Sequence, residues 1–378
     1  MIIVALLSLA VWIGLLAFRD GFWLARATDE GMAPAPARWP AVTAVVPARD
    51  EAEVIARAIG SLIAQDYPGD FRIVLVDDGS SDGTARIARE TAATLGSDRL
   101  TVIAGSAPPA GWTGKLWAMR NGIEQAGEAP DYLWLTDADI AHQPDTLRSL
   151  VARSEQGGLV LNSLMAELLC STFAEKALIP AFVFFFQMLY PFARVNRPAA
   201  RMAAAAGGCM LVKRRALADA GGVAVIADAI IDDCAMGATM KRQGPIRLSL
   251  TRRSASIRPY GGWREVGMMI ARSAYAQLGY SPLMLLGTLV GMGIVYVAPP
   301  LLALFGHGWA QIAGAAAWAA MAVCFQPMLR FYRRSPFWGL ALPAIGMVYA
   351  GATWFSAWRH WQGRGGMWKG RAQARMQQ

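Results

Sequence analysis

The sequence predicts an α/β domain attached to membrane-spanning helices. Short β-rich runs alternate with helical segments over residues 40–260, a pattern typical of a parallel sheet with helices on both faces. Residues 1–18 carry no charged side chain, and no Asp, Glu, Lys or Arg occurs between Arg272 and Arg330. Of the 378 residues, 55% are hydrophobic and only 17% are charged, whereas a soluble domain carries about 25% charged residues. This composition excludes a disordered chain and argues against an ordinary soluble protein.

Charge is segregated along the chain. Residues 1–237 hold 20 basic and 26 acidic residues, residues 241–272 hold eight basic and one acidic, and residues 283–378 hold eight basic and none acidic. The net charge of +9 therefore comes from the second half of the chain. Basic residues beside apolar segments mark the cytoplasmic side of a membrane more often than a nucleic-acid site. We therefore expect a membrane as a partner and no nucleic acid.

Four apolar segments are candidate membrane spans. Residues 1–18 are long enough to cross a bilayer, and they lack the basic start of a signal peptide, so we expect an uncleaved anchor within residues 1–25. Further spans are predicted within residues 281–358, near 283–305, 309–329 and 336–358. Pro299-Pro300 and Gly306-His307-Gly308 offer a turn between the second and third spans, and Pro343 interrupts the fourth.

The basic residues around the first three spans predict an orientation. All of them are cytoplasmic if the N-terminus is outside, which gives a multi-pass protein of the inner (cytoplasmic) membrane with its α/β domain in the cytoplasm. The four cysteines form no Cys-x-x-Cys pair, which fits a reducing compartment. A full fourth span would place the basic tail, residues 359–378, on the opposite side. Either the tail departs from the rule, or segment 336–358 is re-entrant.

Strands are predicted from apolar and β-branched runs between helical segments. In open α/β sheets, ligands bind beyond the carboxyl ends of the strands, and clusters of polar residues follow three of these runs, at 47–51, 77–84 and 137–139. Small residues at 203–208 precede a further β run and would let the backbone approach a ligand. The predicted strands are Val42–Val46, Phe71–Val76, Leu100–Ile103, Tyr132–Thr136 and Cys209–Val212.

Carboxylates at these strand ends predict ligand and metal chemistry. In the turn after the fourth strand, Asp137 and Asp139 can both reach one hard cation such as Mg²⁺ or Mn²⁺, which also binds diphosphate oxygens. Asp77 and Asp78 offer acceptor oxygens to a base edge or to ribose hydroxyls, beyond what capping of the next helix requires.

Two further motifs have both a structural and a functional interpretation. Residues 111–115, Gly-Trp-Thr-Gly-Lys, open a helix whose amide groups and Lys115 would attract phosphate, although a solvated lysine in a helix start explains them equally well. Asp232 and Asp233 are either helix-capping anions or a pair in which mutual repulsion raises one pKa, as suits a proton acceptor.

Two helical segments outside the predicted spans suit a membrane surface. The aromatic segment from Leu178 to Phe192 is too short to span comfortably, so it is either a buried core helix or an interfacial helix near an acceptor entry. Trp263, Val266 and Ile270 recur at helical spacing, which predicts an interfacial amphipathic helix over 263–280.

The motifs resemble those of inverting family 2 glycosyltransferases with the GT-A fold, and they occur in the order found in that family. The nucleotide-binding domain of this fold is Rossmann-like. The resemblance covers about residues 41–272 and places a GT-A domain at 40–262. Three features look like the hopene-associated glycosyltransferase subfamily: Gly-Trp-Thr-Gly-Lys-Leu-Trp-Ala-Met, the aromatic stretch Phe182–Phe192, and Ala-Arg-Ser-Ala-Tyr-Ala-Gln-Leu-Gly-Tyr-Ser after residue 270. The motifs that carry the family resemblance are Val-Pro-Ala-Arg-Asp-Glu, Val-Asp-Asp-Gly-Ser-Ser-Asp-Gly-Thr, Gly-Trp-Thr-Gly-Lys, Thr-Asp-Ala-Asp, Gly-Gly-Cys-Met-Leu-Val and Ile-Asp-Asp-Cys.

The resemblance implies a nucleotide-sugar donor, a membrane lipid acceptor such as a hopanoid or related polyprenoid, and Mg²⁺ or Mn²⁺ as cofactor. It implies one displacement that inverts the sugar, with Asp233 as the general base beside Asp232. The metal ligands would be Asp137 and Asp139. Nucleotide-sugar binding falls to Pro47, Arg49, Glu51, Asp77, Asp78, Lys115, Asp137 and Arg272, and the acceptor and membrane interface to Trp263, Phe185 and Tyr190.

One motif departs from the family pattern. Processive members carry Gln-x-x-Arg-Trp, whereas residues 269–273 here read Met-Ile-Ala-Arg-Ser, so only Arg272 matches. This difference argues against a processive polysaccharide synthase. Transfer to a polyprenyl phosphate, and a catalytically silent lipid-binding or scaffold protein of the same fold, are the alternative functions.

Overall fold

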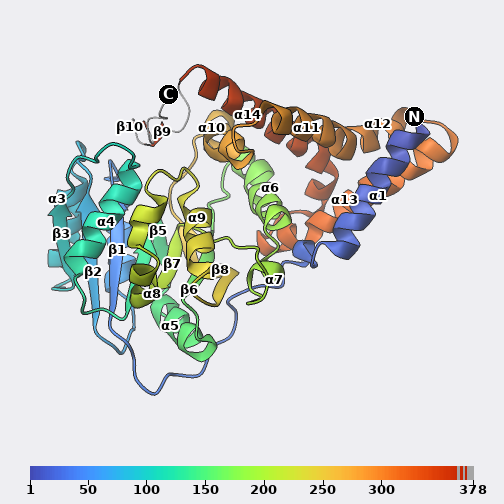
Figure 1. Cartoon of the computed structure of the whole chain (residues 1–378). Coiled ribbons are helices and arrows are strands. Elements are labelled where there is room, and N and C mark those ends of the chain that lie inside the picture. The colour runs from blue at the N-terminus through green and yellow to red at the C-terminus, as the bar shows by residue number, and fades with distance from the viewer. Residues whose placement is uncertain (364–366, 369–370, 373–378) are drawn as a thin grey trace. The chain divides into compact units, whose positions relative to one another are not determined.

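An eight-stranded mixed sheet is the centre of one of the two units of this protein (Figure 1). The computed structural model describes residues 1–363, 367–368 and 371–372, so part of the predicted basic tail lies outside the described residues. The sheet unit comprises residues 27–169, 194–258 and the described residues after 366. The helical unit comprises residues 1–26, 170–193 and the described residues from 259 to 363.

The sheet unit contains ten described strands and several helices, whose bounds follow. The short helix α7 (Phe192–Val195) lies where the chain passes from one unit to the other. The strands are β1 (Val42–Ala48), β2 (Phe71–Asp77), β3 (Leu100–Ala104), β4 (Tyr132–Thr136), β5 (Ile140–His142), β6 (Leu161–Glu167), β7 (Cys209–Lys213) and β8 (Ile246–Ser256), with a separate pair β9 (Met367–Trp368) and β10 (Arg371–Ala372). The helices are α2 (Ile55–Ile63), α3 (Thr84–Thr94), α4 (Gly114–Ala126), α5 (Thr146–Gly157), α8 (Arg214–Asp219), the short 3-10 helix η2 (Gly222–Ile226) and α9 (Asp232–Lys241).

The sheet is parallel on one side and mixed on the other. Its order is β3-β2-β1-β4-β7-β6-β8-β5, and the first four strands are parallel. β7 runs antiparallel to both β4 and β6, and β5 runs antiparallel to β8. The predicted parallel sheet is therefore confirmed for β1, β2, β3 and β4, and the antiparallel β7 departs from it, because the chain between β6 and β7 leaves the sheet through a long helical excursion instead of one crossover helix. The five predicted strands are present.

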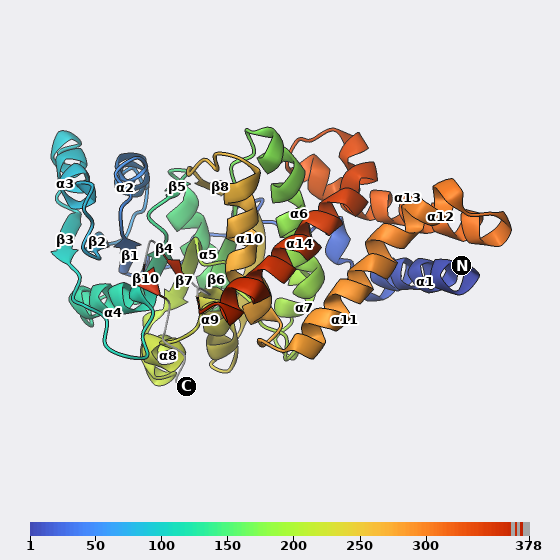
Figure 2. The same cartoon turned by 90° about the horizontal axis from the view of Figure 1, so that it is seen from above.

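Alternate residues of the central strands bury opposite faces of the sheet. Ile73 and Leu75 of β2 belong to the main core, together with apolar residues of α2, α3 and α5. Val74 and Val76 of β2 pack instead against Ala118 of α4. Figure 2 shows α2 and α3 on one side of the strands and α4 on the other. With both faces covered, β1, β2 and β4 are largely apolar, which is why the sequence predicts them as strands.

The elements of the helical unit are α1 (Ile2–Phe18), η1 (Phe22–Leu24), α6 (Phe173–Leu189), α10 (Trp263–Gln277), α11 (Pro282–Met292), the π-helical turn η3 (Gly293–Val297), α12 (Ala298–Phe305), α13 (Gly308–Phe331), η4 (Pro336–Ala341) and α14 (Leu342–Trp361). Among the described residues, three helical stretches are long and apolar enough to cross a membrane: Pro282–Phe305, Gly308–Phe331 and Pro336–Trp361. They agree closely with the predicted spans. The third has 26 residues and contains the predicted segment 336–358, whose full crossing stays a prediction.

Two predicted helix interruptions did not occur. Pro299-Pro300 lies in the first turn of α12 and makes no turn, because the preceding π-helical turn accommodates the prolines and keeps the helix continuous from residue 282 to 305. Pro343 lies in the first turn of α14, where its missing N–H costs no helical hydrogen bond. The break between α12 and α13 is at Gly306-His307, as the sequence predicts.

The helices at 2–18 and 173–189 are shorter. α1 has 17 residues and packs along α13. Its assignment as an anchor stays a prediction. The predicted aromatic segment lies largely in α6, whose residues Val183, Phe184 and Gln187 are buried within the helical unit. α6 therefore fits the core-helix alternative better than an interfacial helix.

A close backbone contact positions the middle of α9 in the sheet unit. A methyl group added to Gly237 would lie 2.7 Å from the carbonyl carbon of Ala204. Because both groups belong to the backbone, no side-chain rotation can relieve such a contact. α9 carries Asp232 and Asp233 in its first turn, so this contact helps to set their position.

We expect Gly237→Ala to destabilise the protein by about 1–3 kcal/mol, because the added methyl group forces α9 away from the backbone at Ala204. Gly267→Ala is the matched control, since nothing lies within 4 Å of a methyl group there and the residue is inside α10. It should be neutral or slightly stabilising. Thermal unfolding in detergent measures both, and equal midpoints for the two variants would contradict this account of the α9 contact.

Candidate active site

The loops that follow β1 and β2 are joined by hydrogen bonds. Ser80 Oγ accepts from the Asp50 amide at 3.0 Å, and Asp50 Oδ1 accepts from the Ser81 amide at 2.8 Å. Thr84 Oγ1 accepts from the Glu51 amide at 2.8 Å. Two of the predicted polar clusters therefore form one edge of the sheet, as the carboxyl ends of neighbouring parallel strands should.

Arg49 and Asp78 form the polar centre of this edge. The Arg49 guanidinium donates to the Asp78 carbonyl oxygen and lies 3.7 Å from its carboxylate, and Asp78 is only 2% exposed. Asp77 remains half-buried, and its Oδ1 accepts from the Ser80 amide at 3.2 Å. Pro47 is a buried residue of β1, where it pairs with Val76 of β2.

Lys115 joins two acidic motifs that lie nearly 100 residues apart. Thr113 caps α4 by accepting from the Leu116 amide at 3.3 Å, which places Lys115 in the first helical turn. The Lys115 Nζ atom lies 2.9 Å from Asp137 Oδ1 and 3.0 Å from Asp232 Oδ2, and its side chain is 15% exposed. The structural alternative for Lys115, a solvated lysine, is therefore wrong.

The electrostatics of Lys115 follow from these two contacts. Burial by itself lowers the pKa of an ammonium group, but the neighbouring Asp137 and Asp232 carboxylates outweigh burial, and the pKa of Lys115 is raised. Lys115 is therefore a permanent cation between the aspartate motif at β4 and the acidic pair at α9.

Arg258, which follows β8, holds the other aspartate of the β4 turn. Its Nε atom donates to Asp139 Oδ2 at 2.9 Å, and its Nη2 atom donates to Glu51 Oε2. The Ile257 amide donates to the Asp139 carbonyl oxygen at 2.8 Å. Burial lowers the pKa of Arg258, but Asp139 and Glu51 raise it more.

Arg258 is a site residue that the sequence motifs do not include. It lies in the basic run at 241–272, which on sequence alone indicates the membrane side. Its position two residues after the end of β8, comparable to those of the acidic clusters, is the pattern that points to the site.

Asp233 lies close to Lys115 across Gly207. The Gly207 amide donates to Asp233 Oδ2 at 3.2 Å, and the Cys234 amide donates to Asp233 Oδ1 at 2.7 Å. A methyl group added to Gly207 would lie 3.4 Å from both Lys115 Nζ and Asp233 Cβ. Burial, and then the neighbouring Asp232 carboxylate, raise the pKa of Asp233 to about 6, and Lys115 and the two amides oppose this rise only in part.

Asp137 and Asp139 fit a divalent cation that is shared with a substrate. Among residues 1–363, 367–368 and 371–372, no cluster of three His, Cys, Asp or Glu residues could hold a metal by itself. Two carboxylates on one turn are nevertheless the donor set with which Mg²⁺ is held beside substrate phosphates, the other ligands being phosphate oxygens and water. The residues present therefore suit a cation that binds together with a diphosphate.

Four predicted site residues belong to the helical unit. Arg272 is exposed on α10, and Trp263, at the start of the same helix, is 50% exposed. Phe185 packs against the ring of Tyr349 at 4.7 Å, and Tyr190 accepts a hydrogen bond from Gln277 at 2.8 Å. Their predicted contacts with donor and acceptor stay predictions.

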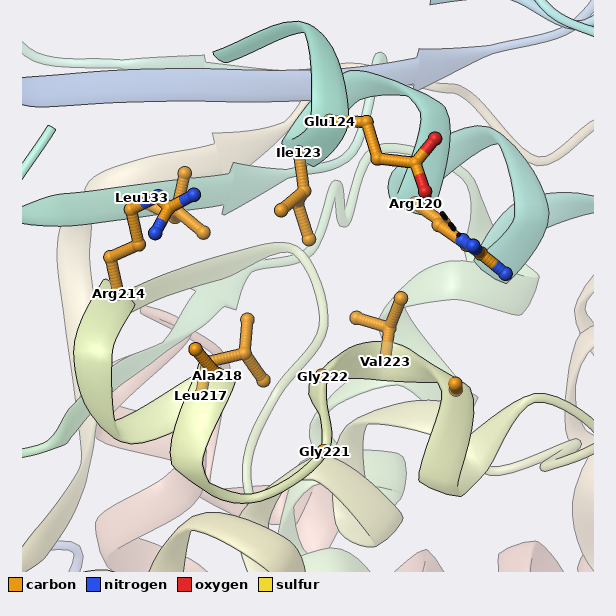
Figure 3. A pocket seen from close by; sticks show the side chains of 11 residues that line it. Arg120, Ile123, Glu124, Leu133, Arg214, Leu217, Ala218, Gly221, Gly222 and Val223 are labelled. Atoms are coloured by element: carbon orange, nitrogen blue, oxygen red, sulfur yellow. Dashed lines mark hydrogen bonds and ion pairs between the residues drawn. The ribbon is translucent and has the colours of Figure 1, made fainter. Parts of the chain in front are cut away.

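A cavity of about 270 Å³ lies between α4, β4 and the α8–η2 segment (Figure 3). Its walls are mainly apolar, with the Arg120–Glu124 ion pair at one side, where the two groups are 2.7 Å apart. None of the predicted site residues lines it, so the catalytic chemistry is expected elsewhere, at the charged edge. The lining residues are Arg120, Ile123, Glu124, Leu133, Arg214, Leu217, Ala218, Gly221, Gly222, Val223 and Ala224.

Comparison with known proteins finds a family that part of this chain matches. Residues 43–221 match the family model "Glycosyl transferase family 2". A 4,4'-diaponeurosporenoate glycosyltransferase of Staphylococcus aureus (strain USA300) is 31% identical over 119 residues, which cover 31% of this chain and 29% of that relative. The chain thus matches less than a third of the length of that curated relative.

The fold also resembles a solved structure. The mannosyltransferase PcManGT from Pyrobaculum calidifontis, in complex with GDP-Man and Mn²⁺, superposes with a TM-score of 0.58 at 21% identity. The alignment covers 94% of this chain and 99% of that one, which shows a shared fold. Residues 43–221 therefore match a family 2 glycosyltransferase domain, and the chain shares the GT-A fold.

Proposed function

We propose that this protein is an inverting glycosyltransferase that moves a sugar from a nucleotide-sugar donor to a hydroxyl group of a membrane lipid. The observation that carries the proposal is the position of Lys115, which contacts both the aspartate motif and the acidic pair at α9. A diphosphate binding there would lie beside a cation, and Asp233 lies within the same small volume. These are the parts that a single displacement at a sugar carbon needs.

The donor would bind along the charged edge of the sheet. Asp77 and Asp78 offer acceptors for base and ribose, with Arg49 holding Asp78 in place. Asp137 and Asp139 would hold Mg²⁺ or Mn²⁺, which stabilises negative charge on a diphosphate leaving group when bound. Lys115 is placed to add a second positive charge to the same leaving group.

Asp233 would act as the general base. The acceptor oxygen forms a bond to C1 of the sugar while its proton passes to Asp233, and the bond from C1 to the diphosphate breaks with its electron pair on the leaving oxygen. One displacement inverts C1, so no covalent intermediate with the enzyme is needed. The raised pKa of Asp233 suits a proton acceptor better than that of an ordinary aspartate.

The acceptor is proposed to be a membrane lipid. The helical unit holds three helices long and apolar enough to cross a bilayer, which supports membrane association. We propose the inner membrane with the sheet unit in the cytoplasm, and Arg272, Trp263, Phe185 and Tyr190 near the lipid. A hopanoid or related polyprenoid alcohol is the finer form of this proposal. Transfer to a polyprenyl phosphate is the alternative enzyme activity.

A lipid carboxylate is the second candidate acceptor. The relative from Staphylococcus aureus is named for diaponeurosporenoate, a carotenoid acid. A carboxylate is already deprotonated at neutral pH, so it needs no general base, whereas an alcohol does. Asp233 therefore distinguishes the two acceptor classes.

We expect Asp233→Asn to lower turnover with an alcohol acceptor by about 10²- to 10⁴-fold while nucleotide binding persists, because only the base is removed. Asp139→Asn should weaken binding of nucleoside diphosphate in the presence of Mn²⁺. Asp66→Asn is the control, since Asp66 is exposed and pairs with Arg148. A thermal-shift panel of nucleotide sugars with Mn²⁺ selects the donor, and mass spectrometry of lipid products measures turnover. Unchanged turnover in both site variants would refute the proposed function.

The same Asp233→Asn variant identifies the acceptor class. With extracted lipid alcohols and lipid acids offered separately, the alcohol hypothesis predicts that wild type glycosylates the alcohols and that the variant does not. Products formed only from lipid acids, at similar rates in wild type and variant, would replace the hydroxyl acceptor with a carboxylate. Absence of any product with every donor would favour the catalytically silent alternative.

The raised pKa of Asp233 predicts a pH-dependent cost in stability. Its pKa is 3.8 ordinarily and about 6 in the folded protein, so the folded state binds its proton more tightly and stability falls as pH rises from about 4 to 6. A shift of about two units corresponds to at most about 3 kcal/mol. Relative to wild type, Asp233→Asn should therefore gain up to about 3 kcal/mol of stability between pH 4 and 7. Unfolding at several pH values checks this, and a difference that stays constant with pH contradicts it.

A further inference from the structure

A buried histidine lies beneath the turn that carries Asp137 and Asp139. His142 ends β5, is 6% exposed, and packs its ring against Trp134 with 4.5 Å between ring centroids. Its Nε2 atom is 3.0 Å from Thr136 Oγ1, and its Nδ1 atom is 2.8 Å from Ser254 Oγ. One side chain thus joins three strands, β4, β5 and β8.

The hydrogen bonds around His142 have a defined direction. The Thr136 hydroxyl donates its proton to the Gly208 carbonyl oxygen at 2.8 Å, so Thr136 Oγ1 must accept from His142 Nε2–H. The other ring nitrogen, Nδ1, then accepts from the Ser254 hydroxyl. Burial lowers the pKa of His142 to about 3, so the ring is neutral and both nitrogens are satisfied.

The two ends of this network reach the two halves of the candidate site. Thr136 directly precedes Asp137, and Gly208 directly follows Gly207, whose amide holds Asp233 at 3.2 Å. The bond from Thr136 to Gly208 therefore ties the end of β4 to the start of β7 at the level of the site.

The network also fixes the far side of the aspartate turn. Residues 137–141 lie between Thr136 and His142, so the bond between these two side chains closes the turn at its base. Ser254 lies on β8, which ends at Ser256, and the amide of the next residue, Ile257, donates to the Asp139 carbonyl oxygen at 2.8 Å. Both aspartates are thus attached to backbone that the network holds.

We propose that His142 is a positioning residue for the glycosyl transfer proposed above, holding the turn with Asp137 and Asp139 in register with the Gly207 amide that orients Asp233. This inference rests on the proposed function. Apolar side chains could fill the same space without the cost of burying polar groups. A fully satisfied polar network instead fixes one geometry, and here that geometry is shared by the metal ligands and the base.

Isosteric variants separate positioning from folding. Thr136→Val removes the hydroxyl at nearly constant volume, and Thr136→Ser restores it. His142→Phe keeps a ring against Trp134 but removes both nitrogens. Ser254→Ala removes the donor to Nδ1. Ser154→Ala is the matched control, because Ser154 is also a fully buried serine that bonds another buried side chain, Asn162, away from the site.

We expect kcat to fall about 10- to 100-fold in Thr136→Val and His142→Phe, because small misplacements of reacting groups cost rate steeply. The Kd of the nucleoside diphosphate, measured by calorimetry with UDP and with GDP in the presence of Mn²⁺, should rise about 10-fold in the same variants. Ser254→Ala should change both quantities in the same direction. Thr136→Ser should stay within about threefold of wild type in both, as should Ser154→Ala, whatever its melting temperature.

A purely structural role gives a different result. If Thr136→Val and Ser254→Ala lower the melting temperature as Ser154→Ala does, yet keep kcat and Kd within about threefold of wild type, the inference is wrong. If His142→Phe does not fold, the comparison of Thr136→Val with Thr136→Ser decides between a positioning role and a purely structural role. A wild-type chain that binds neither nucleotide with Mn²⁺ and transfers no sugar would refute the proposed function itself, and the inference with it.

Discussion

The candidate site depends on three positively charged side chains that separate its carboxylates. Acidic residues that follow several strands of one sheet meet at a single edge, where their mutual repulsion would favour protonation or opening of the loops. Arg49 lies beside Asp78, Lys115 lies between Asp137 and Asp232, and Arg258 lies between Asp139 and Glu51. The pKa values of Lys115 and Arg258 are raised in spite of burial, so both stay charged where they are needed.

These ion pairs also connect segments that no strand pairing joins. Lys115 comes from α4, Asp137 from the turn after β4 and Asp232 from α9, so one ammonium group holds three elements together. A bound diphosphate would compete for the same ammonium group, and a bound cation would compete for the same carboxylates. Binding of both at once keeps the charges balanced, which is why a donor set of two aspartates suits a cation shared with its substrate.

Much of this architecture could be predicted from the sequence. β1, β2 and β4 are buried on both faces and therefore stand out as apolar runs that end in polar clusters. β5 has three residues, too few for any periodicity. β8 carries the exposed Arg252 and the half-buried Arg253 between buried positions, so its sequence indicates a membrane-side charge run and not a strand. The same interpretation hid Arg258. The sequence also could not reveal that Lys115 is shared between two acids, because that pairing depends on how α4 and α9 approach each other.

The absence of acidic residues from the three candidate membrane spans fits the same electrostatics. An ionised carboxylate inside an apolar span has no cation or water nearby and is therefore costly. Arginines are tolerated at span ends, where their long side chains reach water and the last carbonyl groups of the helix are negative. Arg330 lies in the last turn of α13 and Arg359 in the last turn of α14, as this argument requires. The half-buried and buried carboxylates of the site lie instead in the sheet unit, where a guanidinium, an ammonium or a backbone amide is within reach of each one.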